Sequence, residues 1–155
     1  MGVLDEDMQR VVREQRLGYV ASVCPDGTPN VSPKGTLAVW DDAHLVFAHL
    51  HSAQTIANIE AGDGVVEVNV VDPIRRKGYR FKGPATVHTE GVEYEEGLGF
   101  YRERSGLDAD RVRAIVLIEV QHVAPLISPA YDDGTEEAEV ERRTLELYGL
   151  QRTRP

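Results

Sequence analysis

The sequence predicts one domain of the α+β class, mainly β, built as a small six-stranded antiparallel β-barrel with peripheral helices. Three observations favour this class. Short segments rich in β-branched residues recur along the chain and are separated by Gly, Pro and Asp turns. Residues 65–71 alternate strictly, with Val66, Val68 and Val70 on one face. Four further segments show helical patterns, and 155 residues is an ordinary length for one domain.

The first half of the chain predicts a helix, a group of strands and a second helix. Residues 5–16 form an amphipathic pattern that Asp5 can cap. Strands are expected at 17–23, from 31 continuing through 36–40, and at 45–50, and Pro25-Asp26-Gly27 makes the first turn. Residues 52–60 then predict a short helix that ends near Gly62.

The second half predicts three more strands and two helices. Strands are expected at 65–71, 79–89 and 114–120, and Gly83-Pro84 in the middle of one of them indicates a bulge or an edge position. A helix is expected at 91–105 and a loop at 126–134. The last element is an acidic helix at about 135–148, with Thr135 as its expected cap.

The composition excludes several classes of protein. A net charge of −9 argues against a nucleic-acid interface and against an anionic membrane surface as partner. Cys24 is the only cysteine, so there is no intrachain disulfide and no cysteine-based zinc site. The acidic start of the chain has no apolar signal core, and no apolar run approaches the roughly 20 residues of a membrane span. A cytoplasmic location is therefore expected.

A polar bend at 29–35 and the helix that follows Ser52 are the candidates for ligand binding. The Ser52 hydroxyl could cap the helix, or it could donate to a phosphate together with the free amides of the first turn. Lys34 could supply positive charge to a phosphate or an electron-rich ring, or could be an exposed lysine on a bulged strand. Gly35 would allow a flat ligand to approach the backbone closely.

Basic residues and histidines give a second set of candidates. The run from Arg75 to Lys82 holds five cations, which could face an anionic ligand across a subunit boundary or form a solvated hairpin. Within it, Arg80 and Lys82 share one strand face. His49 and His51 also share a face, but no third ligand is evident, so no metal site is predicted. His49 could instead lie at the edge of a ligand.

Several of these segments, in this order and spacing, resemble the pyridoxamine-5′-phosphate-oxidase-like, FMN-binding split-barrel family. They are residues 17–22, 26–35, 45–48 and 78–83, together with the Ser52-x-x-Thr55-x-x-Asn58 helix. The resemblance covers roughly residues 10–125. It implies that residues 1–155 form a single split-barrel flavin-binding domain, and that two copies pair as a homodimer with two equivalent FMN sites at their interface.

The resemblance also implies which residues hold the cofactor. The phosphate would lie near Ser52, Gln54 and Thr55, and a partner subunit would contribute Lys77 and Arg80. The ring would lie against two strands, with Ser32, Pro33, Lys34 and Gly35 on one and Phe47, Ala48 and His49 on the other. Many relatives carry a cation where this chain has Gln54, so either another cation compensates, from Lys34, Arg75, Arg76 or Arg80, or FMN binds more weakly.

The function implied by the resemblance is an FMN-dependent oxidoreductase acting on an unidentified small molecule. No side chain is nominated as a catalytic acid or base. The alternatives are a flavin-binding or electron-carrier protein with no substrate of its own, a split barrel that binds another planar anion such as haem or a deazaflavin, and a structural dimer with an empty groove.

Overall fold

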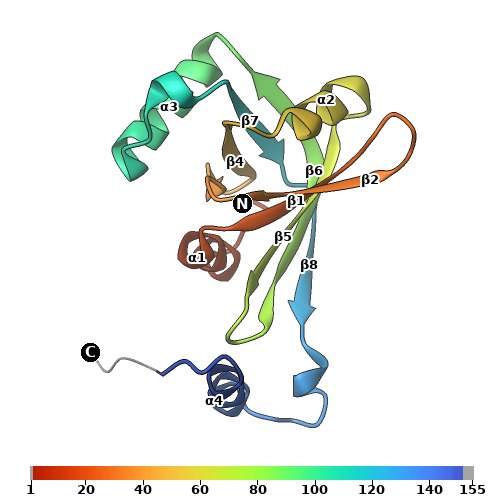
Figure 1. Cartoon of the computed structure of the whole chain (residues 1–155), viewed down its shortest axis with the longest axis vertical. Coiled ribbons are helices and arrows are strands. Elements are labelled where there is room, and N and C mark those ends of the chain that lie inside the picture. Colours follow the sequence, from red (N-terminus) through yellow and green to blue (C-terminus); the bar gives the residue numbers. More distant parts are fainter. Residues whose placement is uncertain (1, 152–155) are drawn as a thin grey trace.

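A computed structural model describes residues 2–151, and its centre is an eight-stranded sheet (Figure 1). The strands lie in the order β2-β1-β5-β6-β7-β4-β3, β8 also pairs with β6, and every pairing is antiparallel. The strands are β1 (Gly18–Val23), β2 (Pro29–Lys34), β3 (Ala38–Val39), β4 (His44–His49), β5 (Val65–Asp72), β6 (Lys77–His88), β7 (Ala114–Glu119) and β8 (His122–Ile127).

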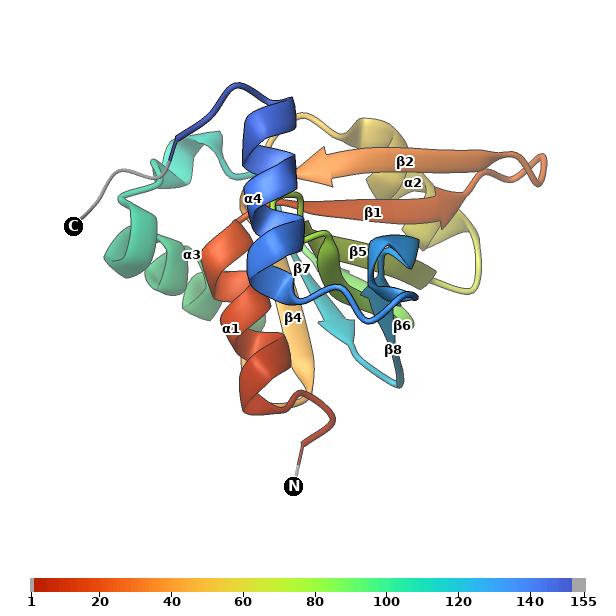
Figure 2. The same ribbon diagram turned by 90° about the horizontal axis from the view of Figure 1, so that it is seen from below.

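Four α-helices surround this sheet. They are α1 (Glu6–Gln15), α2 (Ala53–Ala61), α3 (Val92–Ser105) and α4 (Glu137–Leu147), and short 3-10 turns occupy Ala109–Arg111 and Pro129–Tyr131. Helix α2 packs on β1, β2 and β6, α1 packs on β3 and β5, and α3 packs on β7. Helix α4 lies away from the sheet, next to the turn at Pro129–Tyr131, and is in front of the other elements when the molecule is seen from below (Figure 2).

Helix α1 follows the sequence prediction closely. The Asp5 carboxylate accepts a hydrogen bond from the Met8 amide at 2.9 Å, which satisfies one of the unpaired amides of the first turn. Val11 and Val12 are buried on one side of the helix. The helix ends at Arg16, which adopts a left-handed conformation with φ of 55°.

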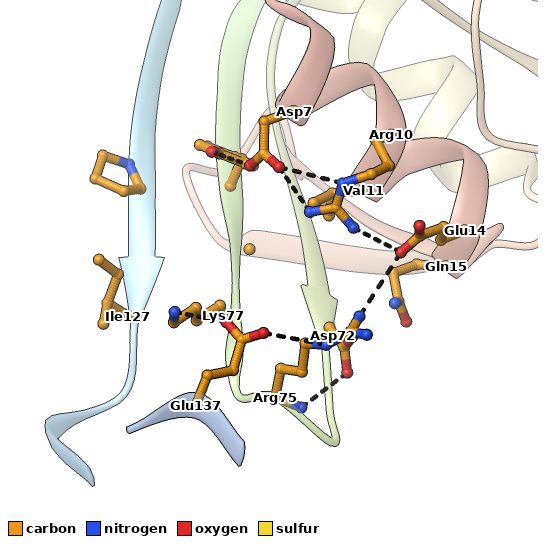
Figure 3. A pocket seen from close by; sticks show the side chains of 13 residues that line it. Asp7, Arg10, Val11, Glu14, Gln15, Asp72, Arg75, Lys77, Ile127 and Glu137 are labelled. Carbon is orange, nitrogen blue, oxygen red and sulfur yellow. Dashed lines mark hydrogen bonds and ion pairs between the residues drawn. The ribbon is translucent and has the colours of Figure 1, made fainter. Parts of the chain in front are cut away.

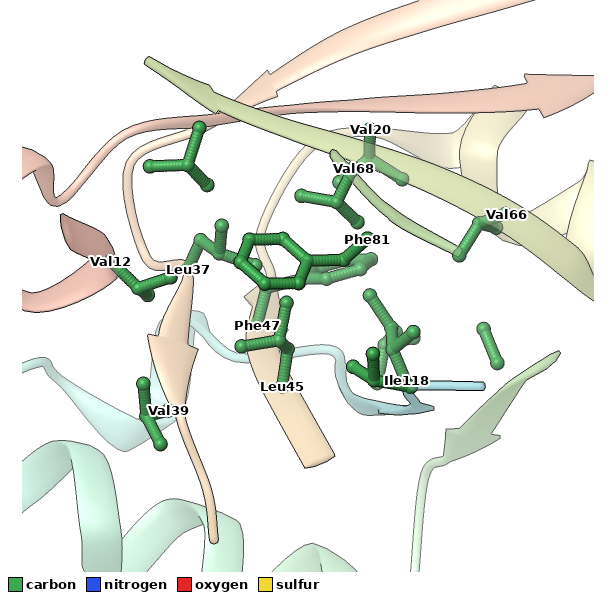
Figure 4. Close-up of a cluster of buried hydrophobic side chains, with 14 of the residues drawn as sticks. Val12, Val20, Leu37, Val39, Leu45, Phe47, Val66, Val68, Phe81 and Ile118 are labelled. Atoms are coloured by element: carbon green, nitrogen blue, oxygen red, sulfur yellow. The ribbon is translucent and has the colours of Figure 1, made fainter. Parts of the chain in front are cut away.

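The main hydrophobic core lies inside the curled sheet (Figure 4). The predicted alternation of β5 is confirmed, because Val66, Val68 and Val70 are all buried there. Phe47 and Phe81 are fully buried in the same cluster. A smaller cluster lies under α3 and covers the other side of β4. Both faces of this strand are therefore buried, and most of its residues are apolar.

Strand β6 changes partners at Gly83, and this bend gives the sheet its half-barrel shape. Residues Lys77–Lys82 pair with β8, whereas Ala85–His88 pair with β7. The end of β7 and its connection to β8 lie against β6 at this point, since a Cβ on Gly83 would lie 1.8 Å from the carbonyl oxygen of Glu119 and 3.2 Å from the amide nitrogen of Gln121. Gly83-Pro84 therefore marks a bend in a central strand and not an edge.

Three sequence predictions need correction. The sheet has eight strands and not six. Residues 122–127 form β8, where only a loop from 126 was expected, and the stretch expected to continue from 31 through 40 is divided into β2 and β3. The expected strand at 36–40 shrinks to Ala38–Val39, since Thr36 and Leu37 turn the corner after β2. Thr135 does not cap α4. Its hydroxyl bonds the carboxylate of Asp133, and the N-cap position belongs to Glu136.

Replacing Gly83 by alanine is expected to destabilise the fold by about 1–3 kcal/mol, because the added methyl group meets backbone that cannot move away cheaply. Gly99→Ala in α3 is the matched control. No atom lies within 4 Å of its Cβ position, so it should be neutral or stabilising by up to ~1 kcal/mol. Urea denaturation of both variants measures this difference, and equal effects would contradict the role assigned to Gly83.

Candidate functional site

A polar cluster forms where β2 ends and α2 begins. The Lys34 ammonium donates to the Ser32 hydroxyl at 2.9 Å, and the Ser32 and Ser52 hydroxyl oxygens are 3.3 Å apart. Ser32 and Lys34 share a face because they are two residues apart on a strand, opposite Val20 and Gly18 of β1. The buried Val20 shows that this face is the inner one.

Lys34 is a buried cation with no counter-ion. Its residue is only 4% exposed, and no carboxylate of the described residues lies within 4.0 Å of its ammonium. The ammonium lies 5.1 Å from the centre of the Phe47 ring. Burial lowers the pKa of Lys34 to about 8. Because a buried charge without a partner is unfavourable, an anion bound nearby would be stabilised strongly.

His49 is a second buried polar group, and one of its ring nitrogens has no hydrogen-bond partner among the described residues. It is 7% exposed, and among residues 2–151 no partner is present for its Nδ1 atom. Burial lowers the pKa of His49, and the charges of Lys34, Arg113 and His51 lower it further. The imidazole is therefore neutral at pH 7 and can accept or donate one further hydrogen bond.

The Ser52 hydroxyl does not cap α2, which decides one alternative left open by the sequence. Ser52 is the N-cap residue, but its side chain makes no capping bond and faces Ser32 instead. A hydroxyl at the start of a helix, above a buried ammonium, is well placed to donate to an anion. This is the one place where the predicted residues of β2 and α2 meet.

A row of amides and hydroxyls behind Ser52 attaches α2 to the sheet. The Asn58 amide donates to the Ser22 hydroxyl at 3.0 Å, and the Asn30 amide donates to Thr55 Oγ1 at 3.5 Å. Thr55 is only 1% exposed. Gln54 is exposed, and its amide donates to Asn58 at 2.8 Å. Thr55 and Asn58 thus position the helix, while Ser52 remains available.

Other predicted residues lie around this cluster in different ways. The Phe47 ring is part of the hydrophobic core, beneath Lys34. The backbone N–H and C=O of Ala48 both bond the Thr36 hydroxyl, at 3.1 and 3.0 Å. Gly35 is exposed, with no atom within 4 Å of the position of a Cβ. Pro33 points away from Lys34, to the outer face of the sheet.

Within one chain, Arg80 and Lys77 do not join the cluster. Arg80 lies on the outer face, in the same row of residues as Pro33, Tyr19 and Asn69, and pairs with Glu67 at 3.0 Å. Lys77 pairs with Glu137 of α4 at 2.8 Å. Any contact of these two cations with a ligand at Ser52 therefore has to come from a second chain.

Lys77 lines a polar cavity of about 470 Å3 between α1, the β5–β6 hairpin and α4 (Figure 3). Cations and carboxylates are interleaved there. Arg10 pairs with Asp7 and Glu14, and Arg75 pairs with Asp72 and Glu137. Because each of these cations already faces a carboxylate, the cavity offers no uncompensated charge to a phosphate. Within one chain, the Arg75 guanidinium is therefore not a free cation that could compensate for Gln54.

Two residues near the cluster were not predicted from the sequence. Arg113 donates its backbone amide to the His49 carbonyl oxygen at 2.9 Å and brings positive charge to that end of β4. The Thr36 hydroxyl bonds both backbone groups of Ala48, near the end of β4. No sequence signal identifies either residue, because both contacts depend on how β4 lies beside its neighbours. In residues 2–151, no group of three or more His, Cys, Asp or Glu side chains is arranged to hold a metal ion.

The described residues contain no helix that has both the length and the apolar character needed to cross a membrane. Comparison with known proteins then gives a consistent result. The family model described as pyridoxamine 5′-phosphate oxidase matches residues 4–126. No curated protein sequence matches the chain.

Solved structures of the same fold are numerous. The chain is 33% identical to HupZ of Group A Streptococcus, with a TM-score of 0.71 and coverage of 81% of this chain and 96% of that one. A putative pyridoxamine 5′-phosphate oxidase of Lactobacillus delbrueckii is 24% identical, with a TM-score of 0.65 and coverage of 78% and 93%. A structure described as an F420 reductase is 23% identical, with a TM-score of 0.60 and coverage of 78% and 98%.

Lys34→Met is expected to stabilise the protein at pH 7. The gain should be at most about 3 kcal/mol, because burial lowers the pKa of Lys34 from the ordinary 10.5 to about 8, and this shift measures the cost of burying the charged ammonium. Between pH 8 and 10.5 the unfolded state binds more protons at this lysine than the folded state does. The unfolding free energy of the wild type should therefore rise with pH across this window.

In Lys34→Met this rise should be missing, and in the exposed control Lys82→Met it should persist. Denaturant unfolding at a series of pH values measures the slopes. Equal slopes in the wild type and Lys34→Met would contradict the assignment of a buried, uncompensated ammonium.

Proposed function

The chain belongs to the pyridoxamine 5′-phosphate oxidase family, and from this membership we propose that it is an FMN-dependent oxidoreductase. The observation that carries the proposal is the uncompensated ammonium of Lys34 beneath the Ser32 and Ser52 hydroxyls. A ligand with a phosphate group would supply the missing counter-charge. Bound FMN would supply the redox chemistry, and the protein would bind and orient it.

The residues present fit a phosphate at the start of α2. Ser52 lies at the positive end of the helix and has no capping partner. Gln54 is neutral, so a cation must come from elsewhere. Arg75 and Arg80 are already paired with carboxylates, and Arg76 is exposed in the turn between β5 and β6, whereas Lys34 is buried and has no carboxylate partner among the described residues. We therefore assign to Lys34 the compensating charge and to Ser32 and Ser52 the donation of hydrogen bonds.

The neighbouring β4 offers a surface for the flat part of the cofactor. The orphaned Nδ1 of His49 can bond a polar edge of a ring, and the neutral imidazole adds no repulsive charge. Gly35 leaves space for close approach of the backbone. Phe47 contributes from below, by packing under Lys34. Thr55 acts indirectly, by fixing the start of α2 against Asn30.

We further propose that two copies pair through the outer face of the sheet. That face presents apolar side chains to solvent, with Tyr19 48%, Val31 60% and Val71 38% exposed. Exposed apolar side chains gathered on one sheet face are typical of an interface. Such pairing would bring Arg80, on this face, and Lys77, at the neighbouring hairpin, toward the partner's cofactor, which is the contribution that the family resemblance implies.

Comparison of FMN with riboflavin tests the phosphate site. Ser52→Ala and Lys34→Met should each raise the dissociation constant of FMN by about tenfold or more, because each removes a charge-assisted interaction with the phosphate. Riboflavin, which lacks the phosphate, should bind all three proteins alike. Quenching of flavin fluorescence measures both constants.

Ser105→Ala and Arg102→Gln, both on α3, serve as controls outside the cluster and outside the outer face of the sheet, and should leave FMN binding unchanged. An equal loss of FMN and riboflavin affinity in Lys34→Met would move Lys34 from the phosphate to the ring. A wild-type protein that binds no flavin would contradict the proposed function. Oxidation of a nicotinamide donor by the FMN-loaded protein, faster than by free FMN, separates an enzyme from a carrier.

Val31→Asp should convert the dimer to a monomer, since it places a charge on the proposed interface. Val92→Asp is the control, because Val92 is 68% exposed at the start of α3 and lies outside this face. Light scattering coupled to gel filtration gives the masses. FMN affinity should fall with the loss of the dimer, and a monomeric wild type would contradict the proposed pairing.

A further inference from the structure

A groove of about 500 Å3 opens between α1, the corner after β2 and the C-terminal half of α3. Figure 1 shows α1 and α3 on the same flank of the molecule, with β4 between them. The floor of the groove is apolar and aromatic, and includes Leu37, Val39, Phe100, Tyr101 and Leu107. Its volume is that of an ordinary small-molecule site.

The charged residues of the groove are all cations. Arg13, Arg16 and Arg104 line it, and no Asp or Glu does. None of the three has a carboxylate partner among the described residues, whereas Arg10, on the same helix as Arg13, pairs with Asp7 and Glu14. In a chain of net charge −9, this is a local concentration of uncompensated positive charge.

One wall of the groove is already arranged for a planar ligand. The Arg104 guanidinium lies 4.4 Å above the centre of the Phe100 ring. A guanidinium stacked on a ring keeps its hydrogen-bond donors free at its edge, where they can bond a carboxylate or phosphate. An aromatic or apolar body could pack on Leu37 and Leu107 below.

The groove reaches the corner that carries the proposed flavin site. Gly35 lines it and directly follows Lys34. The Tyr101 hydroxyl, from α3, donates to the Thr36 carbonyl oxygen at 2.7 Å. The Thr36 side chain in turn bonds Ala48, the residue before His49. The two sites therefore share one wall of backbone.

We propose that this groove binds the substrate, and that the substrate is an organic anion with an apolar or aromatic body. The role as substrate site rests on the proposed function, because it needs a flavin beside Gly35. The binding of such an anion does not, because it depends only on the arginines and the apolar floor.

The fluorescent anion 8-anilinonaphthalene-1-sulfonate is the probe, used with FMN-free protein. The wild type should bind it with an affinity that falls as NaCl is raised. Arg16→Gln combined with Arg104→Gln should weaken binding about tenfold and reduce the salt dependence. Arg102→Gln combined with Arg111→Gln removes the same charge from exposed positions outside the groove and should bind as the wild type does.

Competition defines the ligand class. Both 2-naphthoate and 2-naphthyl phosphate should displace the probe, and the stronger competitor identifies carboxylate or phosphate as the preferred head group. The neutral 2-naphthol should displace it poorly. Arg16→Lys combined with Arg104→Lys keeps the charge and should retain intermediate affinity, so the result does not depend on the glutamine variant folding well.

Equal probe binding by the wild type and Arg16→Gln/Arg104→Gln would overturn the proposal, as would equal displacement by 2-naphthol or no probe binding at all. FMN titration of the same variant keeps the two proposals apart. It should bind FMN like the wild type, which shows that only the groove was changed. If no form of the protein binds FMN while the arginines still govern probe binding, the proposed function fails and the anion site stands.

Discussion

The bend of β6 at Gly83 is the constraint on which the remaining architecture depends. It lets β6 pair with β5 and β8 from Lys77 to the bend, and with β7 beyond it, from Ala85 to His88. The sheet therefore curls around Phe47 and Phe81 instead of staying flat. The same curl brings the ends of β2 and β4 to one corner, where the start of α2 meets them. A side chain at residue 83 would collide with the β7–β8 connection, so the bend requires glycine.

That corner carries a cost in folding stability. An inward-facing lysine costs free energy when it has no counter-ion, and a more stable protein would place an apolar residue at position 34. The orphaned Nδ1 of His49 adds to this cost. A buried ammonium without a counter-ion and an unpartnered imidazole nitrogen in one corner are the usual sign of a site that a ligand completes. The pairing of Asn58 with Ser22 shows that buried polar groups elsewhere around α2 are satisfied.

Charge is distributed unevenly in this acidic chain. On α1, the β5–β6 hairpin and α4, cations alternate with carboxylates and neutralise one another, as Arg10, Arg75 and Lys77 do. Around the corner after β2, the positive groups have no such partners. Lys34 lies on one side of this corner, and Arg16 and Arg104 lie on the other. Anionic ligands would thus be attracted to one region while the rest of the surface repels them.

The sequence by itself determined the type and order of most elements, because the period of apolar residues and the turn residues act locally. It predicted α1 with its Asp5 cap and the buried valines of β5. It missed β8, whose residues His122 and Pro125 carry little strand signal and which is held only by pairing with β6. The resemblance pointed to Ser32, Lys34 and Ser52. Only the tertiary structure decided that Lys34 is buried, and that Arg75 and Arg80 are paired with carboxylates. Burial and ion pairing depend on which distant segments meet, and the local pattern of residues carries no record of that.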